Sequence, residues 1–324
     1  MSLFSPAAHA QPFFLKAAAG ERYCLFHPAV GACRGGLVYV PPFGEEMNKS
    51  RRMAALQARA LAAQGIAVLQ IDLYGTGESS GDFADARWEL WLADVALGCQ
   101  WLAARLGRPV GLWGLRLGAL LALDYARAQQ ALGAPAPQRL LLWQPVHSGS
   151  SYLTQFLRLR MANEMLGADG SQKTGTAALR DQLRDGQALE VAGYALAPEL
   201  ADALDRLELS KIAPPPCPLH WLDVVAAEGR PLTPASAKLV AAWQQQGAEL
   251  DAQAVAGPPF WGTQEIATCP ALLEASSAIF NDGANRAANT GQAAINGAGI
   301  GGGSGGGIGG GIDSSGSSEA IHAV

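Results

Sequence analysis

The chain has 324 residues, of which 49% are hydrophobic and 16% are charged, and its formal net charge is −5. This length suits one large α/β domain with additions or two small domains, and the apolar fraction is enough for a sizeable core. No dense block of Lys or Arg is present, which argues against a nucleic-acid partner because phosphate binding needs a positive surface.

The cysteines and the N-terminus indicate where the protein resides. The five cysteines are widely spaced and form no C-x-x-C pair, so we expect free thiols in a reducing compartment and neither disulfides nor a zinc site. No basic and apolar leader precedes the stretch AHAQ at 8–11, and no run of about 18 apolar residues occurs. We therefore predict a soluble, cytoplasmic protein with no signal peptide, no transmembrane segment and no metal or other cofactor.

Strand-like and helical runs alternate along the first half of the chain. Two short strands open it as a hairpin, and Asn48 and Gly65 are expected to bound the first helix. Asp82 and Asp85 are expected to cap the second helix. We predict strands at 12–17, 21–28, 36–42, 66–72, 109–113 and 139–145, and helices at 48–65, 85–106 and 116–130. Apolar strands alternating with helices indicate a mostly parallel, doubly wound sheet, whose ligands bind at the carboxyl ends of the strands.

The alternation is interrupted near 150–210, where the sequence is mainly helical and is expected to form a cap over the sheet. Within it, 151–166 is amphipathic, which favours packing inside the cap over docking on a membrane. The sheet pattern resumes with strands at 217–225 and 249–256 and helices at 234–246 and 264–280. We therefore predict one domain over 1–282 and a disordered Gly/Ser-rich tail over 283–324.

The stretch GLWGLRLGALL at 111–121 carries the most specific motif. A strand enters Gly114-Leu115-Arg116-Leu117-Gly118, and a helix rich in small residues follows at once. This is the G-x-S-x-G arrangement of the nucleophile elbow, with arginine in the place of serine. The loop IDLYGTGESSGDF at 71–83 resembles the stretch that follows an early strand of α/β-hydrolases, and in it we expect Asp72 and Ser79 to shape the turn.

Four longer stretches resemble one family. VPPFGEEMNKSRRM, WGLRLGALLA, LLWQPVHSGSSYLTQFLRLRMANEM and GPPFW are similar to the exosortase A system-associated hydrolase 2 family, over roughly residues 10–280. The resemblance implies the α/β-hydrolase fold with a helical cap and a nominal hydrolase activity. It also implies a bacterium that sorts proteins with a PEP-CTERM tail and makes exopolysaccharide.

A Ser-His-Asp triad is not complete in this sequence. Arginine cannot attack a carbonyl group, because its guanidinium stays protonated. The loop after the last strand, where a histidine is expected, reads GPPFW at 257–261. Of the five histidines, only His147 follows the carboxyl end of a strand closely enough to reach the pocket, and a histidine of a surface loop is the more usual interpretation of it. Glu228 lies near the position of the triad acid, although a solvated loop carboxylate is an equally good interpretation.

Arg116 would lie in the first turn of a helix, where the helix dipole opposes a cation by about 0.3–1 kcal/mol. We therefore expect a carboxylate partner, and the candidates are Glu45, Glu46 and Glu228. In one interpretation this pair only fills an inactive site. In the other, Arg116 and the backbone N–H groups of Phe43 and Leu117 bind a carboxylate or phosphate of the ligand.

Two classes of function remain open. In the first, the protein is a non-catalytic or anion-binding accessory to exosortase-linked export and exopolysaccharide production, and it recognises an anionic glycolipid, acyl or peptide group or a protein of that pathway. In the second, it hydrolyses or transfers an acyl group without a serine. Water would then attack, activated by Glu45, Glu46, His147 or Glu228, while Arg116 neutralises the developing charge.

Overall fold

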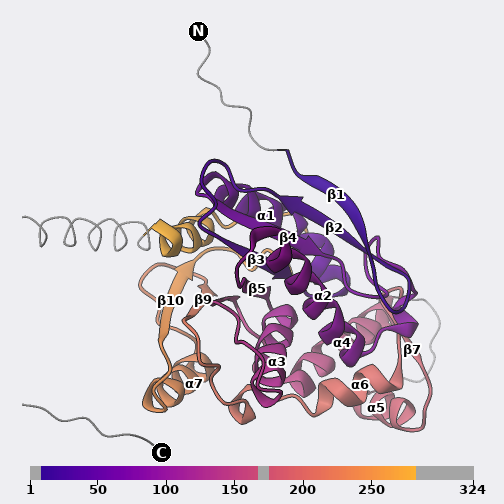
Figure 1. Ribbon diagram of the computed structural model, residues 1–324. Coiled ribbons are helices and arrows are strands. Elements are labelled where there is room, and N and C mark those ends of the chain that lie inside the picture. The colour runs from indigo at the N-terminus through magenta and orange to yellow at the C-terminus, as the bar shows by residue number, and fades with distance from the viewer. Residues whose placement is uncertain (1–8, 167–174, 282–324) are drawn as a thin grey trace, which may run out of the picture. The chain divides into compact units, whose positions relative to one another are not determined.

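The computed structural model describes residues 9–166 and 175–281, with only the backbone of 162–166. The tail predicted at 283–324 lies outside this range. The centre is an eight-stranded sheet of order β1-β2-β4-β3-β5-β6-β9-β10 (Figure 1). Only the pairs β1–β2 and β2–β4 are antiparallel, so the predicted mostly parallel sheet is confirmed. The strands are β1 (Gln11–Lys16), β2 (Glu21–His27), β3 (Gly35–Val40), β4 (Ile66–Ile71), β5 (Gly111–Leu115), β6 (Leu140–Trp143), β9 (Leu219–Val225) and β10 (Leu250–Ala256).

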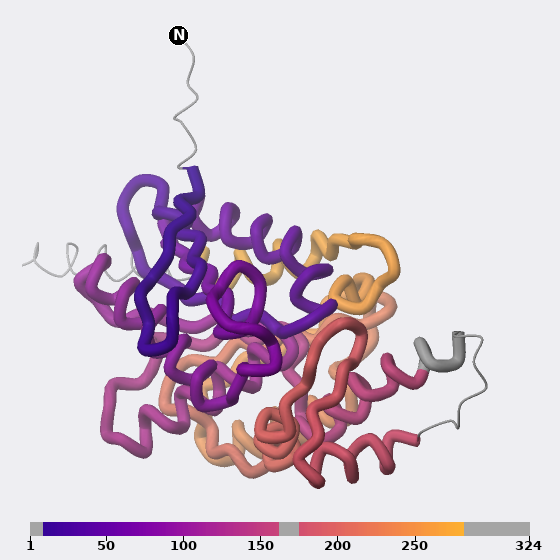
Figure 2. Tube along the Cα trace, turned by 90° about the vertical axis from the view of Figure 1, so that its right-hand side faces the viewer, coloured from indigo at the N-terminus to yellow at the C-terminus, as the bar shows by residue number. Residues whose placement is uncertain are grey.

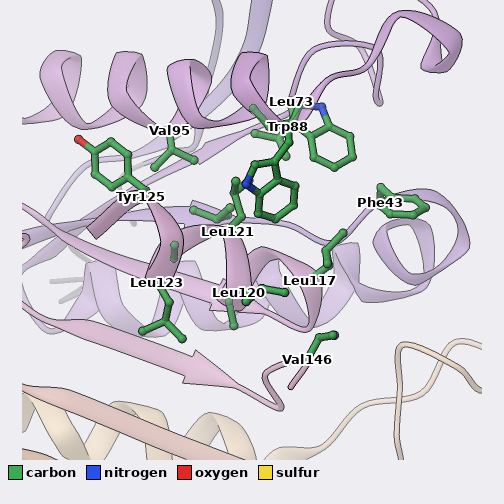
Figure 3. Close-up of a cluster of buried hydrophobic side chains, with 14 of the residues drawn as sticks. Phe43, Leu73, Trp88, Val95, Leu117, Leu120, Leu121, Leu123, Tyr125 and Val146 are labelled. Carbon is green, nitrogen blue, oxygen red and sulfur yellow. The ribbon is translucent and has the colours of Figure 1, made fainter. Parts of the chain in front are cut away.

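Helices cover both faces of the sheet and give it two cores. The helices α2 (Trp88–Leu106), α3 (Leu117–Ala131) and α7 (Pro234–Gln245) pack on one face, where the larger hydrophobic cluster lies (Figure 3). The helix α1 (Gly44–Ala63) and a last helix over 270–281 pack on the other face. All residues of β3, β5 and β6 are buried as a result, which is why these strands are continuously apolar in the sequence.

The predicted cap is present between β6 and β9. It contains α4 (Gly149–Leu166), α5 (Thr176–Arg184), α6 (Pro198–Asp205) and a 3₁₀ turn at Leu209–Lys211. The side chains of Leu153, Phe156 and Leu157 are buried, so packing within the protein accounts for the apolar side of α4. No described helix has both the length and the apolar content needed to cross a membrane.

The cap also contains a small hairpin that the sequence analysis missed. The strands β7 (Leu189–Val191) and β8 (Tyr194–Leu196) pair across a two-residue turn (Figure 2). Both turn residues have positive φ, 50° at Ala192 and 84° at Gly193, as tight hairpin turns require. Three-residue strands are too short to show an alternating pattern, and alanine is an unusual residue for this conformation.

Several predicted boundaries are wrong. Helix α1 begins at Gly44, so Asn48 is inside the helix and does not cap it, and its side chain instead donates to the hydroxyl of Tyr194. Asp82 and Asp85 form a capping box around the 3₁₀ turn Phe83–Asp85, before α2 begins. The last helix begins at 270, six residues later than predicted. In each case tertiary contacts or a short extra turn displaced the boundary inferred from local propensity.

The turn after β4 has the structural role predicted for Asp72 and Ser79. The hydroxyl of Ser79 donates to the carbonyl of Asp72 at 2.6 Å and accepts from the N–H of Tyr23 at 2.9 Å. The carboxylate of Asp72 accepts from the N–H of Glu78 and pairs with Arg51 at 3.1 Å. These contacts attach the turn to β2 and α1.

All five cysteines, Cys24, Cys33, Cys99, Cys217 and Cys269, fall within the described residues and are free thiols. Burial is the main reason that the pKa of each of Cys24 and Cys99 is raised to about 12. These thiols are therefore protonated and unreactive at neutral pH.

Candidate functional site

The turn between β5 and α3 has the strained backbone of a nucleophile elbow. Arg116 is the N-cap of α3 with φ 54° and ψ −118°, a conformation that costs a non-glycine residue about 1–3 kcal/mol. The N–H of Arg116 donates to the carbonyl of Trp143 at 2.9 Å, and its carbonyl accepts from the N–H of Val146 at 3.4 Å. The neighbouring strand β6 therefore supports this backbone and aims residue 116 outward at the carboxyl edge of the sheet.

The two glycines of the motif are required by close backbone contacts. A Cβ atom on Gly114 would lie 2.5 Å from the Cα of Ala119, inside the first turn of α3. A Cβ atom on Gly118 would lie 2.1 Å from the carbonyl oxygen of Val40 and 2.6 Å from that of Pro41. Helix α3 thus begins directly against the loop that follows β3. The glycine spacing of the elbow is intact even though its central residue is not a nucleophile.

Arg116 has the carboxylate partner that its position requires, and the partner is Glu46. Both Nε and Nη2 of Arg116 lie 3.2 Å from the same oxygen, Oε1 of Glu46. The hydroxyl of Tyr152, on the cap helix α4, donates to the other oxygen at 3.1 Å. The side chains of Arg116 and Glu46 are 16% and 22% exposed. Burial raises the pKa of the Glu46 carboxyl, and the nearby guanidinium opposes that shift only in part.

The other two candidate carboxylates do not reach Arg116. Glu45 is exposed on α1, where it accepts from Asn48 and from the hydroxyl of Tyr194. Glu228 is exposed in the loop after β9, and within the described part of the chain its carboxylate has no hydrogen-bond or ion-pair partner. Successive residues on a helix point about 100° apart, which is why Glu46 faces the elbow and Glu45 does not.

Trp261 occupies the place where a catalytic histidine was sought. It lies in the loop after β10, 9% exposed, and its ring centroid is 5.4 Å from the guanidinium carbon of Arg116. The ring of Tyr152 is 5.9 Å from the same carbon. Both distances are typical of cation–π contacts. The sequence analysis assigned no role to either aromatic residue, although Trp261 ends the GPPFW motif and the missing histidine was itself a signal.

Two backbone donors lie near the elbow. Phe43 is the N-cap of α1 and Leu117 is the first residue of α3, and Figure 3 shows both toward the same end of the buried cluster. Neither N–H donates to any described residue. The phenyl ring of Phe43 packs against Phe83, Trp91, Tyr152 and Phe156. The N-termini of two helices therefore meet near Arg116, an arrangement that favours anions.

His147 follows β6 at the same edge of the sheet. Its Nε2 atom lies 3.0 Å from the hydroxyl of Ser236, and its ring packs against Trp221 at 5.4 Å between centroids. Burial lowers the pKa of His147, while the carboxylates of Asp223 and Glu208 act in the opposite direction. At neutral pH the imidazole is therefore uncharged.

The arrangement presents groups that suit an anion, and neither position 116 nor the loop after β10 presents the nucleophile or the base of a serine acylation mechanism. Position 116 presents a cation in place of a hydroxyl group, and the loop after β10 presents an indole in place of an imidazole. Within the residues that the structure describes, no three His, Cys, Asp or Glu side chains gather in a way that could hold a metal ion. Among the described residues, the groups at this edge are the guanidinium of Arg116 paired with the carboxylate of Glu46, two helix N-termini and a neutral histidine.

The comparisons with known proteins agree with this architecture. The profile of the family described as "Serine aminopeptidase, S33" matches residues 34–171, which is less than half of the chain. No curated protein sequence matches the chain at a significant level.

Solved esterase structures share the fold. A structure of Est1E from Butyrivibrio proteoclasticus with ferulic acid bound superposes with a TM-score of 0.56 at 15% identity, covering 85% of this chain and 98% of that chain. A thermostable carboxyl esterase from Bacillus coagulans, in complex with glycerol, gives 0.56 at 13% identity, covering 84% and 98%. The metagenomic carboxylesterase EstE1 gives 0.54 at 14%, covering 87% and 91%. The chain therefore has the α/β-hydrolase fold.

Proposed function

We propose that this α/β-hydrolase-fold protein binds an anionic or acyl ligand at Arg116 and does not act as a serine hydrolase. The observation that carries the proposal is the replacement of both reacting groups. A guanidinium stands at the elbow, and the ring of Trp261 packs against it from the loop after β10. Arginine cannot supply a nucleophile, whereas it is well suited to a carboxylate or phosphate.

The contacts of Arg116 leave part of its guanidinium available. Nε and Nη2 are used by Glu46, whereas Nη1 has no partner among the described residues and the side chain is 16% exposed. The unused N–H groups of Phe43 and Leu117 add two donors at helix N-termini. Because Glu46 already balances the charge of Arg116, a ligand must share the guanidinium with that carboxylate. We therefore expect selective binding of modest affinity.

Binding measurements test the proposal. Ferulate, octanoate and inorganic phosphate would be titrated into the protein and into its Arg116→Gln variant by calorimetry. A hydrogen bond to a charged group contributes about 1.5–3 kcal/mol, so Arg116→Gln should weaken binding of the preferred anion by about 10- to 100-fold. Arg52→Gln, which changes an exposed arginine on α1, is the matched control and should bind like the unaltered protein.

Two results would refute the proposal. One is binding that Arg116→Gln leaves unchanged. The other is stoichiometric labelling of a pocket serine by a fluorophosphonate probe, which reacts with activated serine hydroxyls.

The alternative function is hydrolysis or acyl transfer without a serine, and His147 is the observation that favours it. A neutral imidazole that is protonated on Nε2 could accept a proton from an attacking water at Nδ1, with Arg116 stabilising the negative charge that develops. A screen of esters and thioesters distinguishes the two functions. Turnover that is abolished in both His147→Phe and Arg116→Gln would support the alternative. Anion binding without turnover would support the first proposal.

We extend the proposal to an accessory role in the cytoplasm, linked to exosortase-dependent sorting and exopolysaccharide production. The support is the resemblance of VPPFGEEMNKSRRM, WGLRLGALLA and GPPFW to the exosortase-associated family. The test is deletion of the gene in its own bacterium, with PEP-CTERM processing and exopolysaccharide yield as readouts. Unchanged values of both would remove the link to that pathway and leave the binding site itself unaffected.

A further inference from the structure

His147 is held beside Arg116 by contacts on three sides. The N–H of the preceding residue, Val146, donates to the carbonyl of Arg116 at 3.4 Å. The carbonyl of His147 accepts from the N–H of Leu209, in the last turn of the cap, at 2.9 Å. The imidazole ring packs against Trp221. The ring therefore has a defined position between the sheet edge and the end of the cap.

The hydrogen bonds at the start of α7 bear on which nitrogen of His147 carries the proton. Thr233 is the N-cap of α7, and its hydroxyl oxygen accepts from the N–H of Ser236 at 3.3 Å. The same hydroxyl donates to the Oγ of Ser236 at 2.9 Å. Ser236 is fully buried, and its Oγ lies 3.0 Å from Nε2 of His147, so when the Thr233 hydroxyl donates to Ser236, the Ser236 hydroxyl hydrogen is left for Nε2. In that network Nε2 accepts, and a nitrogen that accepts cannot carry the ring proton, which assigns the proton to Nδ1.

The surroundings keep this imidazole neutral. Asp223 on β9 and Glu208 beside the 3₁₀ turn of the cap favour the charged form, while burial and Arg116 oppose it, and the net effect lowers the pKa of His147. Asp223 is fully buried and accepts from Nε1 of Trp221 and from the N–H of Thr233. Nδ1 of His147 has no partner among the described residues, and the side chain is only half-buried. The Nδ1–H group is thus an unused donor.

We propose that His147 is a second ligand-binding residue of the site, offering a neutral Nδ1–H donor to an oxygen of the ligand that Arg116 holds. Ser236 and Thr233 are positioning residues, because they fix the tautomer without reaching the ligand. Two binding residues restrict the ligands expected at this site. These ligands are carboxylates or phosphates that carry a second oxygen acceptor, either a carbonyl or a hydroxyl group. This inference rests on the proposed function.

The tautomer can be measured without any ligand. Nitrogen-15 NMR separates protonated from unprotonated ring nitrogens, and the signals of His147 are assigned by their loss in His147→Asn. Nδ1 should be protonated and Nε2 unprotonated at pH 7.5, the reverse of the usual preference of a free imidazole. Ser236→Ala should restore a mixture or the usual form. An Nε2-protonated ring in the unaltered protein would overturn the inference.

Two substitutions then test the ligand contact with the same anion used for Arg116. His147→Asn places an amide donor close to the Nδ1 position, whereas His147→Gln places its amide near Nε2. A neutral hydrogen bond corresponds to about a fivefold change in affinity, so His147→Gln should bind about fivefold more weakly and His147→Asn nearly as well as the unaltered protein. Equal affinities of the two variants would overturn the ligand contact.

The outcomes separate this inference from the proposed function. Binding that depends on Arg116 but not on His147 would refute the inference alone. Failure of the unaltered protein to bind any of the anions would refute the proposed function and the ligand contact together. The NMR result would still test whether Thr233 and Ser236 fix the tautomer of His147.

Discussion

Neutralising Arg116 should destabilise the protein more than neutralising Glu46, although the two side chains form one ion pair. Their charged atoms lie 3.2 Å apart and are mostly buried. At an effective dielectric constant of about 20, two unit charges at this separation attract by about 5 kcal/mol. The loss of hydration offsets much of this attraction, and side chains in contact typically couple by about 0.5–3 kcal/mol.

The two substitutions differ in what they leave behind. Arg116→Gln leaves the hydroxyl of Tyr152 as the only donor to the Glu46 carboxylate among the described residues. Removing the cation from the N-terminus of α3 stabilises the helix by about 0.3–1 kcal/mol, which offsets part of that loss. We expect a net loss of about 2 kcal/mol, or about 4–8 °C in Tm. Glu46→Gln keeps an oxygen acceptor for Arg116, turns an amide N–H toward the Tyr152 hydroxyl oxygen, which can accept it, and removes a carboxylate whose pKa burial has raised. Its cost should be below about 1 kcal/mol.

Urea unfolding, followed by circular dichroism and tryptophan fluorescence, measures the free energy of unfolding of Arg116→Gln, of Glu46→Gln and of the double variant. Glu45→Gln, on the same turn of α1, is the control. Because the folded protein holds the Glu46 proton more tightly than the unfolded chain, the unaltered protein should lose stability relative to Glu46→Gln as pH rises above about 4.3. Equal losses in the two single variants, or additivity within about 0.5 kcal/mol in the double variant, would refute the reasoning.

Two further predictions concern the elbow and His147. Gly118→Ala places a methyl group 2.1 Å from the carbonyl oxygen of Val40 and 2.6 Å from that of Pro41, so it should cost at least about 3 kcal/mol in a urea titration, and a loss below about 1 kcal/mol would contradict the close approach. The lowered pKa of His147 means that the unfolded chain binds this proton more tightly. Stability should therefore be complete above pH 6.5 and fall as pH decreases from there toward the lowered pKa, a loss absent from the pH profile of His147→Asn.

Much of the fold could be predicted from local sequence, because it depends on patterns that burial on both faces imposes. The strands β3, β5 and β6 are continuously apolar, and the glycines of the elbow are needed wherever a helix starts this close to a strand. The helix boundaries were less accurate, since Gly44 rather than Asn48 begins α1. The hairpin β7–β8 was missed because its strands are too short to show a period.

The candidate site could be predicted only in part. Arg116 and its need for a carboxylate follow from the motif and from the helix dipole, and the three candidates included the right one. The rotation of about 100° between successive helix residues turns Glu46, and not Glu45, toward Arg116. Tyr152 and Trp261 come from the cap and from the last loop, and no local pattern shows that both rings converge on one guanidinium.

The sequence by itself determined that the turn before α3 carries an arginine, that the loop GPPFW directly after the last strand has no histidine, and that a layered α/β sheet surrounds them, because these are properties of residue identity and hydrophobic period. Only the tertiary structure decided which carboxylate neutralises that arginine, which aromatic rings enclose it, and which hydroxyl faces His147. Those features depend on side chains from β6, α1, α4, α7 and the last loop meeting at one edge of the sheet, and distance along the chain carries no information about such meetings.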